Sequence, residues 1–158
     1  MSVLRKYARM VGMDERAWQR HANPWSVWTR FAAVPAAILA IWSRTWIGWW
    51  ALAPLALVIA WLWWNPHVFA PVEKPVAWSS LGIYGERMWV ADRSSMPPGF
   101  DVVQRFWTIG TLSGLVLLVW GLVALAVWPT IFGATIIVYG QLWRIDRLGI
   151  AYGNAEGR

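Results

Sequence analysis

The sequence predicts an all-α integral membrane protein with four transmembrane helices arranged as two hairpins. Residues 106–143 contain no Asp, Glu, Lys or Arg, and residues 31–64 contain only Arg44. A helix rises about 1.5 Å per residue and a bilayer core is about 30 Å thick, so each stretch is long enough for two spans. Apolar residues make up 58% of the chain and charged residues 14%, against roughly 25% charged residues in soluble domains.

Turn-forming residues divide each apolar stretch in two. Proline can begin a helix but interrupts its interior, so Trp128-Pro129 predicts the turn of the second hairpin. A polar turn around Arg44 divides the first stretch, and Asn23-Pro24 provides an N-cap and a first-turn proline for its opening helix. We expect one membrane domain over residues 1–158. Its four spans are expected at residues 24–43, 45–64, 107–127 and 129–145.

The segments outside the spans are expected to lie on the membrane surface. In the N-terminal segment, residues 1–23, apolar side chains of 3–12 recur on one helical face and basic ones on the other, which is typical of an interfacial helix. The central segment, residues 65–106, is rich in proline at both ends, and a second amphipathic interfacial helix is expected there over 79–93. Both helices lie next to spans, where an amphipathic surface is suited to the headgroup layer.

The positions of the basic residues predict the orientation. The net charge is +6, and 13 of the 14 Lys and Arg residues fall in segments 1–30, 65–106 and 144–158, the exception being Arg44. Four spans place these three segments on one side, so both termini and the central segment are expected in the cytoplasm. The basic side chains are then expected near anionic lipid headgroups of the cytoplasmic membrane, and a nucleic-acid partner is not expected.

The spans contain little that could carry transport or catalysis. Apart from Tyr139 at the end of one span, their central parts lack ionisable side chains, and pumps and ion channels usually need such groups at membrane depth. A carrier for a neutral, apolar molecule is not excluded. The chain has no cysteine, no Gly-rich phosphate loop and no Ser nucleophile motif, so we assign no catalytic residue and no metal site, and no cofactor is required.

Small residues recur at four-residue spacing along two spans. Such spacing lets helices approach closely in a membrane. We favour packing within the four-helix unit over packing against a second protein, because the pattern is common in any helical bundle. The expected packing residues are Ala32, Ala36, Ala40, Gly110, Gly114 and Gly121.

Two groups of side chains on the cytoplasmic side are candidates for ligand binding. One is a histidine pair, which could meet at the base of the first hairpin and ligate a metal or haem. The other is the charged part of the central segment, which could hold an anionic headgroup. Helix-end hydrogen bonds and structural ion pairs are the favoured interpretations, and the ligand readings stay open as alternatives. The candidates are His21, His67, Glu86, Arg87, Asp92 and Arg93, with Asp101, Arg105, Asp146 and Arg147 nearby.

Four motifs are similar to those of a membrane family of bacteria and archaea known only as a domain of unknown function. They are HANPWSVWTRF at residues 21–31, WSRTWIGWW at 42–50, GER-x-W at 85–89 and WPT-x-FG at 128–133. The resemblance covers residues 17–147. It implies the same four-span fold and brings no activity, substrate or catalytic residue.

The function predicted from these observations is structural. We expect a non-catalytic accessory or scaffold subunit that packs against itself, as a homo-oligomer, or against a larger membrane complex. The motivation is the lack of ionisable groups in the spans together with the small-residue faces. The alternative is a protein or enzyme that binds a lipid, quinone or tetrapyrrole at the cytoplasmic face.

Overall fold

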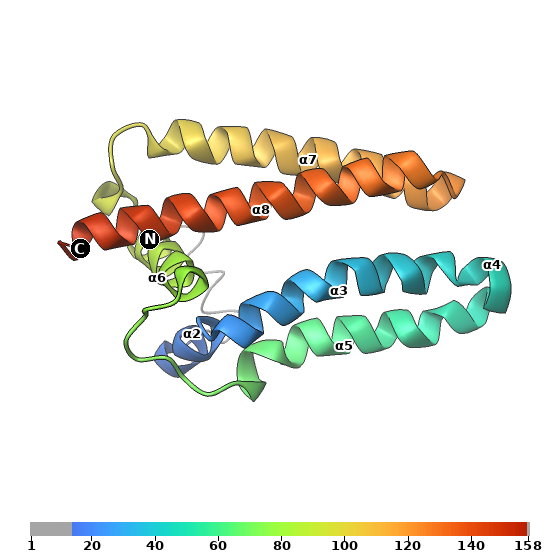
Figure 1. Cartoon of the computed structure of the whole chain (residues 1–158), viewed down its shortest axis with the longest axis horizontal. Helices are drawn as coiled ribbons and strands as arrows, with labels where there is room; N and C mark the ends of the chain where they lie inside the picture. Colours follow the sequence, from blue (N-terminus) through green and yellow to red (C-terminus); the bar gives the residue numbers. More distant parts are fainter. Residues whose placement is uncertain (1–13, 158) are drawn as a thin grey trace.

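The computed structural model describes residues 14–157, and all regular elements of this part of the chain are helices. Helices account for 85% of the structure, so the all-α prediction is confirmed. Two long helical hairpins lie side by side, and shorter helices gather at one end (Figure 1). The helix expected over 3–12 lies outside the described residues. The shorter helices at that end are α2 (Glu15–His21), α6 (Trp78–Ala91) and η2 (Arg93–Ser95).

The first hairpin begins at the helix-start signal in the sequence. The side-chain oxygen of Asn23 accepts a hydrogen bond from the Trp25 amide at 3.0 Å, and Pro24 occupies the first turn. The return helix begins seven residues later than expected, because residues 44–51 form short helical turns that broaden the connection. The hairpin comprises α3 (Pro24–Trp42), α4 (Arg44–Ile47), η1 (Gly48–Ala51) and α5 (Leu52–Val68).

A buried polar contact closes the base of the first hairpin. Asn65 is fully buried, accepts a hydrogen bond from Ser26 Oγ at 2.6 Å and donates one to Thr29 Oγ1 at 2.8 Å. The span expected over 45–64 ends before Asn65-Pro66, but α5 continues to Val68. These contacts hold the last turn of α5 against α3, so tertiary packing overrides the local effect of the proline.

The second hairpin begins earlier in the chain and ends later than expected. It comprises α7 (Phe100–Ala124) and α8 (Val127–Ala155), joined by a turn in which Leu125 adopts a φ of 52°. The turn therefore precedes Trp128-Pro129, and Pro129 lies in the first turn of α8, where its missing N–H costs nothing. The two helices approach closely where Gly121 lies against Thr130 and Gly114 against Gly133.

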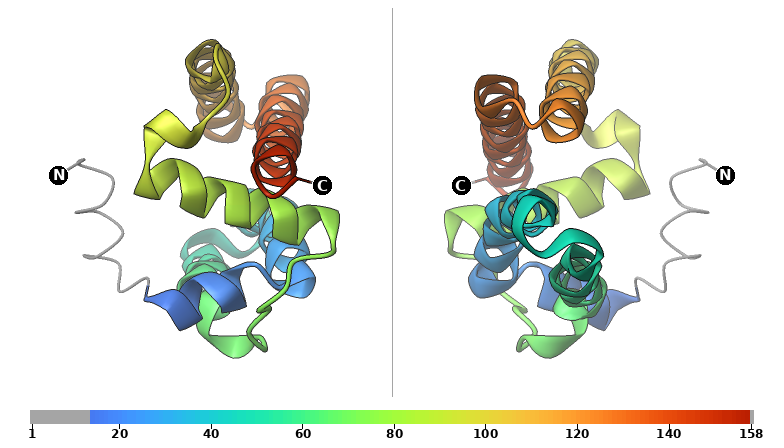
Figure 2. Two further views of the ribbon diagram at one scale, coloured as in Figure 1. Left: turned by 90° about the vertical axis from the view of Figure 1, so that its left-hand side faces the viewer. Right: turned by 90° about the vertical axis from the view of Figure 1, so that its right-hand side faces the viewer.

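Helix α6 crosses the ends of both hairpins and joins them (Figure 2). It packs on α8 through Gly82 and Gly85, and a Cβ added at Gly85 would collide with the Leu148 carbonyl. Ser80 Oγ donates a hydrogen bond to the Ala22 carbonyl at 2.7 Å, which fixes α6 to the end of α2. The buried apolar cluster at this junction consists of Ala22, Val27, Ile83 and Ile145.

A second link joins the hairpins at the opposite end. Arg44 Nη2 donates hydrogen bonds to the carbonyls of Leu122 at 2.5 Å and Val123 at 3.0 Å. These carbonyls belong to the last turn of α7, where backbone acceptors lack partners within the helix and the helix dipole favours a cation. The hairpins are therefore connected at both ends.

Two stretches of the described chain are long and apolar enough to cross a membrane: Pro24–Val68 and Phe100–Ala124. A core helix of a soluble protein would pass the same test but would be mostly buried. Here the buried share of the most apolar window is 6% and 11%. Large apolar side chains such as Leu57 and Val116 are exposed, at 72% and 69%. Exposed apolar surface of this kind is typical of helices that contact lipid or another protein.

Candidate functional site

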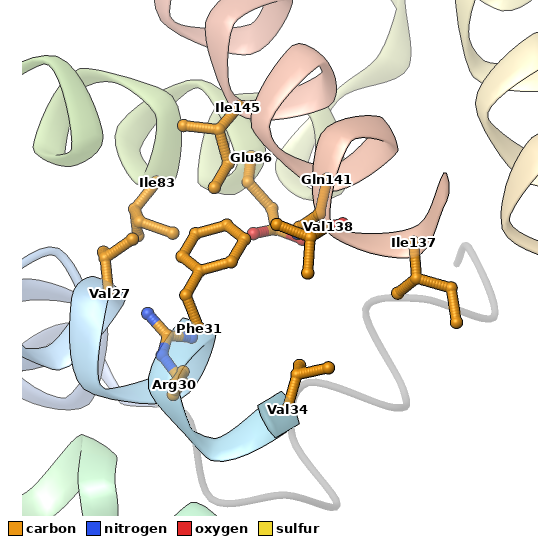
Figure 3. Close-up of a pocket in the computed structure, with 10 residues that line it drawn as sticks. All are labelled: Val27, Arg30, Phe31, Val34, Ile83, Glu86, Ile137, Val138, Gln141 and Ile145. Carbon is orange, nitrogen blue, oxygen red and sulfur yellow. The ribbon is translucent and has the colours of Figure 1, made fainter. Parts of the chain in front are cut away.

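A cavity of about 200 Å³ lies where α3, α6 and α8 meet (Figure 3). Figure 3 shows Phe31 reaching from α3 toward Val138 of α8, close to the carboxylate of Glu86 from α6. Residues of both hairpins therefore line the same cavity, together with residues of α6. The polar lining comes from Arg30, Glu86 and Gln141. The apolar lining comes from Val27, Phe31, Val34, Ile83, Ile137, Val138 and Ile145.

Arg30 is held in place by three hydrogen bonds on one side. Its Nη1 contacts His21 Nε2 at 2.5 Å, its Nη2 donates to the His21 carbonyl at 3.2 Å, and its Nε donates to the Ser26 carbonyl at 3.0 Å. The carboxylate of Glu86 lies near enough to attract it electrostatically. The guanidinium is thus a cation held by hydrogen bonds at the edge of the cavity.

His21 is held neutral by this arrangement. Burial, and to a lesser degree the positive charge of Arg30, together lower its pKa from 6.5 to about 3. Since Arg30 donates to Nε2, the ring proton resides on Nδ1, which is buried and has no acceptor among the described residues. The neutral ring therefore serves as a hydrogen-bond acceptor that positions Arg30.

A buried ion pair lies beside the cavity. Arg144 Nη2 contacts Glu86 Oε1 at 2.9 Å, with side-chain exposures of 6% and 23%. The guanidinium also lies 4.6 Å from the ring centroid of Trp107 and 5.6 Å from that of Trp89, which are cation–π distances. Glu86 therefore lies between two cations, Arg30 and Arg144, from different hairpins.

The two histidines have different surroundings. His67 is exposed, and its ring lies 6.3 Å from that of Trp63. The link to α2 runs through Arg20, whose Nη1 donates to the His67 carbonyl at 3.3 Å. Within residues 14–157, no three His, Asp or Glu side chains gather as a metal site would require. The base of the hairpin brings the histidine segments together, while the rings contact Arg30 and Trp63 respectively.

The remaining charged candidates divide into separate contacts. Arg87 Nη2 pairs with Glu15 at 2.6 Å on the surface, and Asp92 accepts a hydrogen bond from the Ser94 amide at 3.0 Å. Arg93 lies 5.2 Å from the Trp89 ring centroid. Of these residues and Glu86, the cavity includes Glu86 alone.

The small residues expected to pack helices have mixed surroundings. Gly114 and Gly121 lie against α8, and Ala40 is buried. A Cβ at Gly110 would meet nothing within 4 Å, and Ala32 and Ala36 are exposed along a groove between α3 and α5.

Sequence reasoning did not single out Arg30, Gln141 or Arg144 as site residues. Both arginines lie at the end of an apolar stretch, where a basic residue is expected from the headgroup layer alone. Gln141 could have been noticed as a strong polar residue in the charge-free stretch 106–143. For the arginines, the sequence holds no comparable signal, since their partners are far away in the chain.

These residues define a class: an all-helical protein with candidate membrane helices and a small, mostly apolar cavity that carries paired charges. The sequence matches the family of unknown function DUF6653 over residues 2–157, so the chain belongs to that family. The expected relation to an uncharacterised family is confirmed in this form. Comparisons with curated proteins and with solved structures gave no match.

Proposed function

We propose that this chain is a four-span protein of the bacterial or archaeal cytoplasmic membrane, with both termini in the cytoplasm. Helices α2, α6 and η2 gather with the C-terminal end of α8 at one end of the hairpins (Figure 1). Basic residues cluster in these segments, whereas the other end carries Arg44. This distribution supports the proposal, since basic residues concentrate on the cytoplasmic side of membrane proteins.

The function that the geometry favours is the binding of one apolar chain of an amphiphile, such as a lipid or an isoprenoid quinone. The observation that carries it is the cavity between α3, α6 and α8, which has apolar walls and a polar lining from Arg30, Glu86 and Gln141. Pockets that enclose a whole drug-sized ligand span about 300–1,000 Å³. A cavity of about 200 Å³ therefore suits part of a molecule and is too small for a tetrapyrrole.

The polar groups at the cavity are suited to orienting a ligand and not to transforming it. Arg30 is held by His21 and Ser26, and Glu86 is paired with Arg144. A general base needs a carboxylate or imidazole free to accept a proton near neutral pH, and the pKa of His21 is lowered to about 3. We therefore propose a non-catalytic binding protein.

Native mass spectrometry of the protein extracted in mild detergent tests the binding proposal. The wild type is expected to retain one small amphiphile per chain. Val138→Trp fills the cavity and is expected to lose it, whereas Val116→Trp, which makes the same change at an exposed site on α7, is expected to retain it. An empty wild type, or equal ligand content in the two variants, would contradict the proposal.

A second candidate function is that of an accessory or scaffold subunit, alone or together with ligand binding. The observation that favours it is the open surface at Gly110, where the groove between α7 and α8 has room for the side chains of another helix. Gly110→Leu is expected to weaken self-association or the capture of a membrane partner without lowering the melting temperature. Unchanged complexes in native mass spectra would remove this candidate.

A further inference from the structure

A second cleft, of about 570 Å³, lies between α6 and α7 and shares no residue with the cavity described above. It lies at the boundary between the charged and the uncharged part of α7. Arg105 is the last charged residue before the uncharged stretch that begins at Phe106. In the proposed topology, this boundary is at the level of the lipid headgroups. The charged, amide and indole side chains that line it are Trp89, Arg93, Asp101, Gln104, Arg105 and Trp107.

Two guanidinium groups from different segments face this cleft. Arg93 comes from η2 and Arg105 from α7, and both are exposed. Arg105 makes no hydrogen bond or ion pair with any described residue, and Arg93 lies 5.2 Å from the Trp89 ring centroid. Stacking occupies the face of a guanidinium and leaves its N–H edge available for an oxyanion. Two such edges at one cleft match the oxygens of a phosphate.

The two indole rings of the cleft share a cationic neighbour. Trp89 and Trp107 both lie against the guanidinium of Arg144, which is anchored by Glu86. Arg144 thus adds positive charge beneath the rings, although Glu86 compensates it. The rings themselves are of the type that concentrates at the membrane–water interface.

Two hydrogen-bond donors of the lining lack an acceptor in the described part of the chain. They are Gln104 Nε2 and Trp107 Nε1, and both atoms are buried. Gln104 as a whole is 8% exposed. Most buried polar atoms in native proteins are paired, so two unpaired donors make the lining of this cleft unusual. Asp101, the carboxylate of the lining, can accept hydrogen bonds from a headgroup hydroxyl or ammonium.

We propose that this cleft binds the phosphate of a membrane phospholipid headgroup, with Arg93 and Arg105 as the phosphate ligands. The phosphate supplies the acceptors that the two arginines lack, and Trp89 and Trp107 flank the headgroup. A lipid is favoured over free phosphate because the cleft adjoins exposed apolar residues of α7, of which Ile109 is 64% exposed and belongs to the lining. The assignment rests on the proposed membrane topology but not on the cavity between α3, α6 and α8.

The test is native mass spectrometry of the full chain in detergent with added phosphatidylglycerol, phosphatidylethanolamine or phosphatidylcholine. Arg105→Gln removes a cation without other described contacts, so folding is not at risk. We expect its affinity for the preferred phospholipid to fall about tenfold, as loss of one charged hydrogen-bond partner implies. Arg147→Gln is the matched control, since Arg147 pairs with its neighbour Asp146 outside the cleft.

Equal losses in Arg105→Gln and Arg147→Gln would overturn the site, because net charge alone would then explain binding. Full displacement of the lipid by millimolar inorganic phosphate would overturn the lipid assignment in favour of free phosphate. Absence of phospholipid binding by the wild type would overturn the proposal itself. Failure of the underlying topology is recognised separately, by cysteine labelling at the two ends of the hairpins, which does not depend on lipid binding.

Discussion

Glu86 has a central position at the scale of single residues. It pairs with Arg144 on α8 and attracts Arg30 on α3, so one carboxylate from α6 serves both hairpins. Because Arg144 is only 5% exposed, solvent cannot screen its positive charge, and Glu86 is the partner that compensates it. An unpaired buried charge is far more costly than an unpaired surface charge.

Glu86→Ala is therefore expected to lower the free energy of unfolding by about 3 kcal/mol, because it leaves Arg144 buried without a counter-charge. Glu15→Ala, which breaks the exposed pair with Arg87, is expected to cost less than about 1 kcal/mol. Denaturant unfolding in detergent micelles measures both. Similar effects of the two substitutions would show that the Glu86–Arg144 pair contributes no more than a surface contact.

His21 makes stability depend on pH. Its pKa is lowered from 6.5 to about 3 in the folded protein, so between these values the unfolded chain binds the proton and the folded chain does not. The contribution is fully present above pH 6.5 and is lost as the pH falls, by up to about 1.4 kcal/mol per unit.

We expect the unfolding free energy of the wild type to fall between pH 6 and pH 4, and this slope to become shallower in His21→Gln. Chemical unfolding at several pH values measures it. His67→Gln is the control and is expected to keep the wild-type slope, since His21 is untouched. A slope that His21→Gln leaves unchanged would mean that the ring is not held neutral by burial.

At the scale of elements, the position of α6 on α8 depends on two glycines. Gly82 lies against Ile145 and Gly85 against the backbone of Leu148, so α6 contributes no side chain at these two contacts. A methyl group at Gly85 would require α6 to move away, which would also move Glu86 and the cavity wall that it supplies.

Gly85→Ala is expected to lower the free energy of unfolding by about 2 kcal/mol, because overpacking outweighs the gain in helix propensity. Gly153→Ala makes the same change in α8, where the new methyl group meets nothing within 4 Å, and is expected to be neutral or stabilising by up to about 1 kcal/mol. Thermal unfolding in micelles distinguishes them. Equal stability of the two variants would mean that α6 is not closely packed on α8.

Helix type was predictable from the sequence, and helix ends were less so. The apolar stretches and the Asn23-Pro24 start predicted long helices, and α3 begins at the expected residue. The second hairpin turns at Leu125, before the expected Trp128-Pro129, because a proline is tolerated within the first turn of a helix. Residues 44–51 form a wide connection whose geometry is fixed by Arg44 and its contact with α7, which local sequence does not encode.

At the scale of the whole molecule, the candidate site was only partly predictable. Glu86 was singled out as part of a charge cluster, but Arg144, its partner, is 58 positions away, and Arg30 belongs to the other hairpin. Such contacts depend on how α6 crosses the hairpins, which no periodicity or spacing specifies. The cavity results from the same crossing and could not be predicted.

The arrangement of the hairpins predicts opposite exposure for their two ends. Trp49, near Arg44, is 87% exposed at the end expected outside the cell, and Ser94 is exposed at the end expected in the cytoplasm. The chain has no cysteine, so a single introduced cysteine reports one position without background.

Labelling of Trp49→Cys and Ser94→Cys with a membrane-impermeant maleimide in intact bacterial cells tests the four-span topology most directly. We expect the Trp49→Cys variant to be labelled in intact cells and the Ser94→Cys variant to be labelled only after permeabilisation. Labelling of both, of neither even after permeabilisation, or in the reverse order would contradict it.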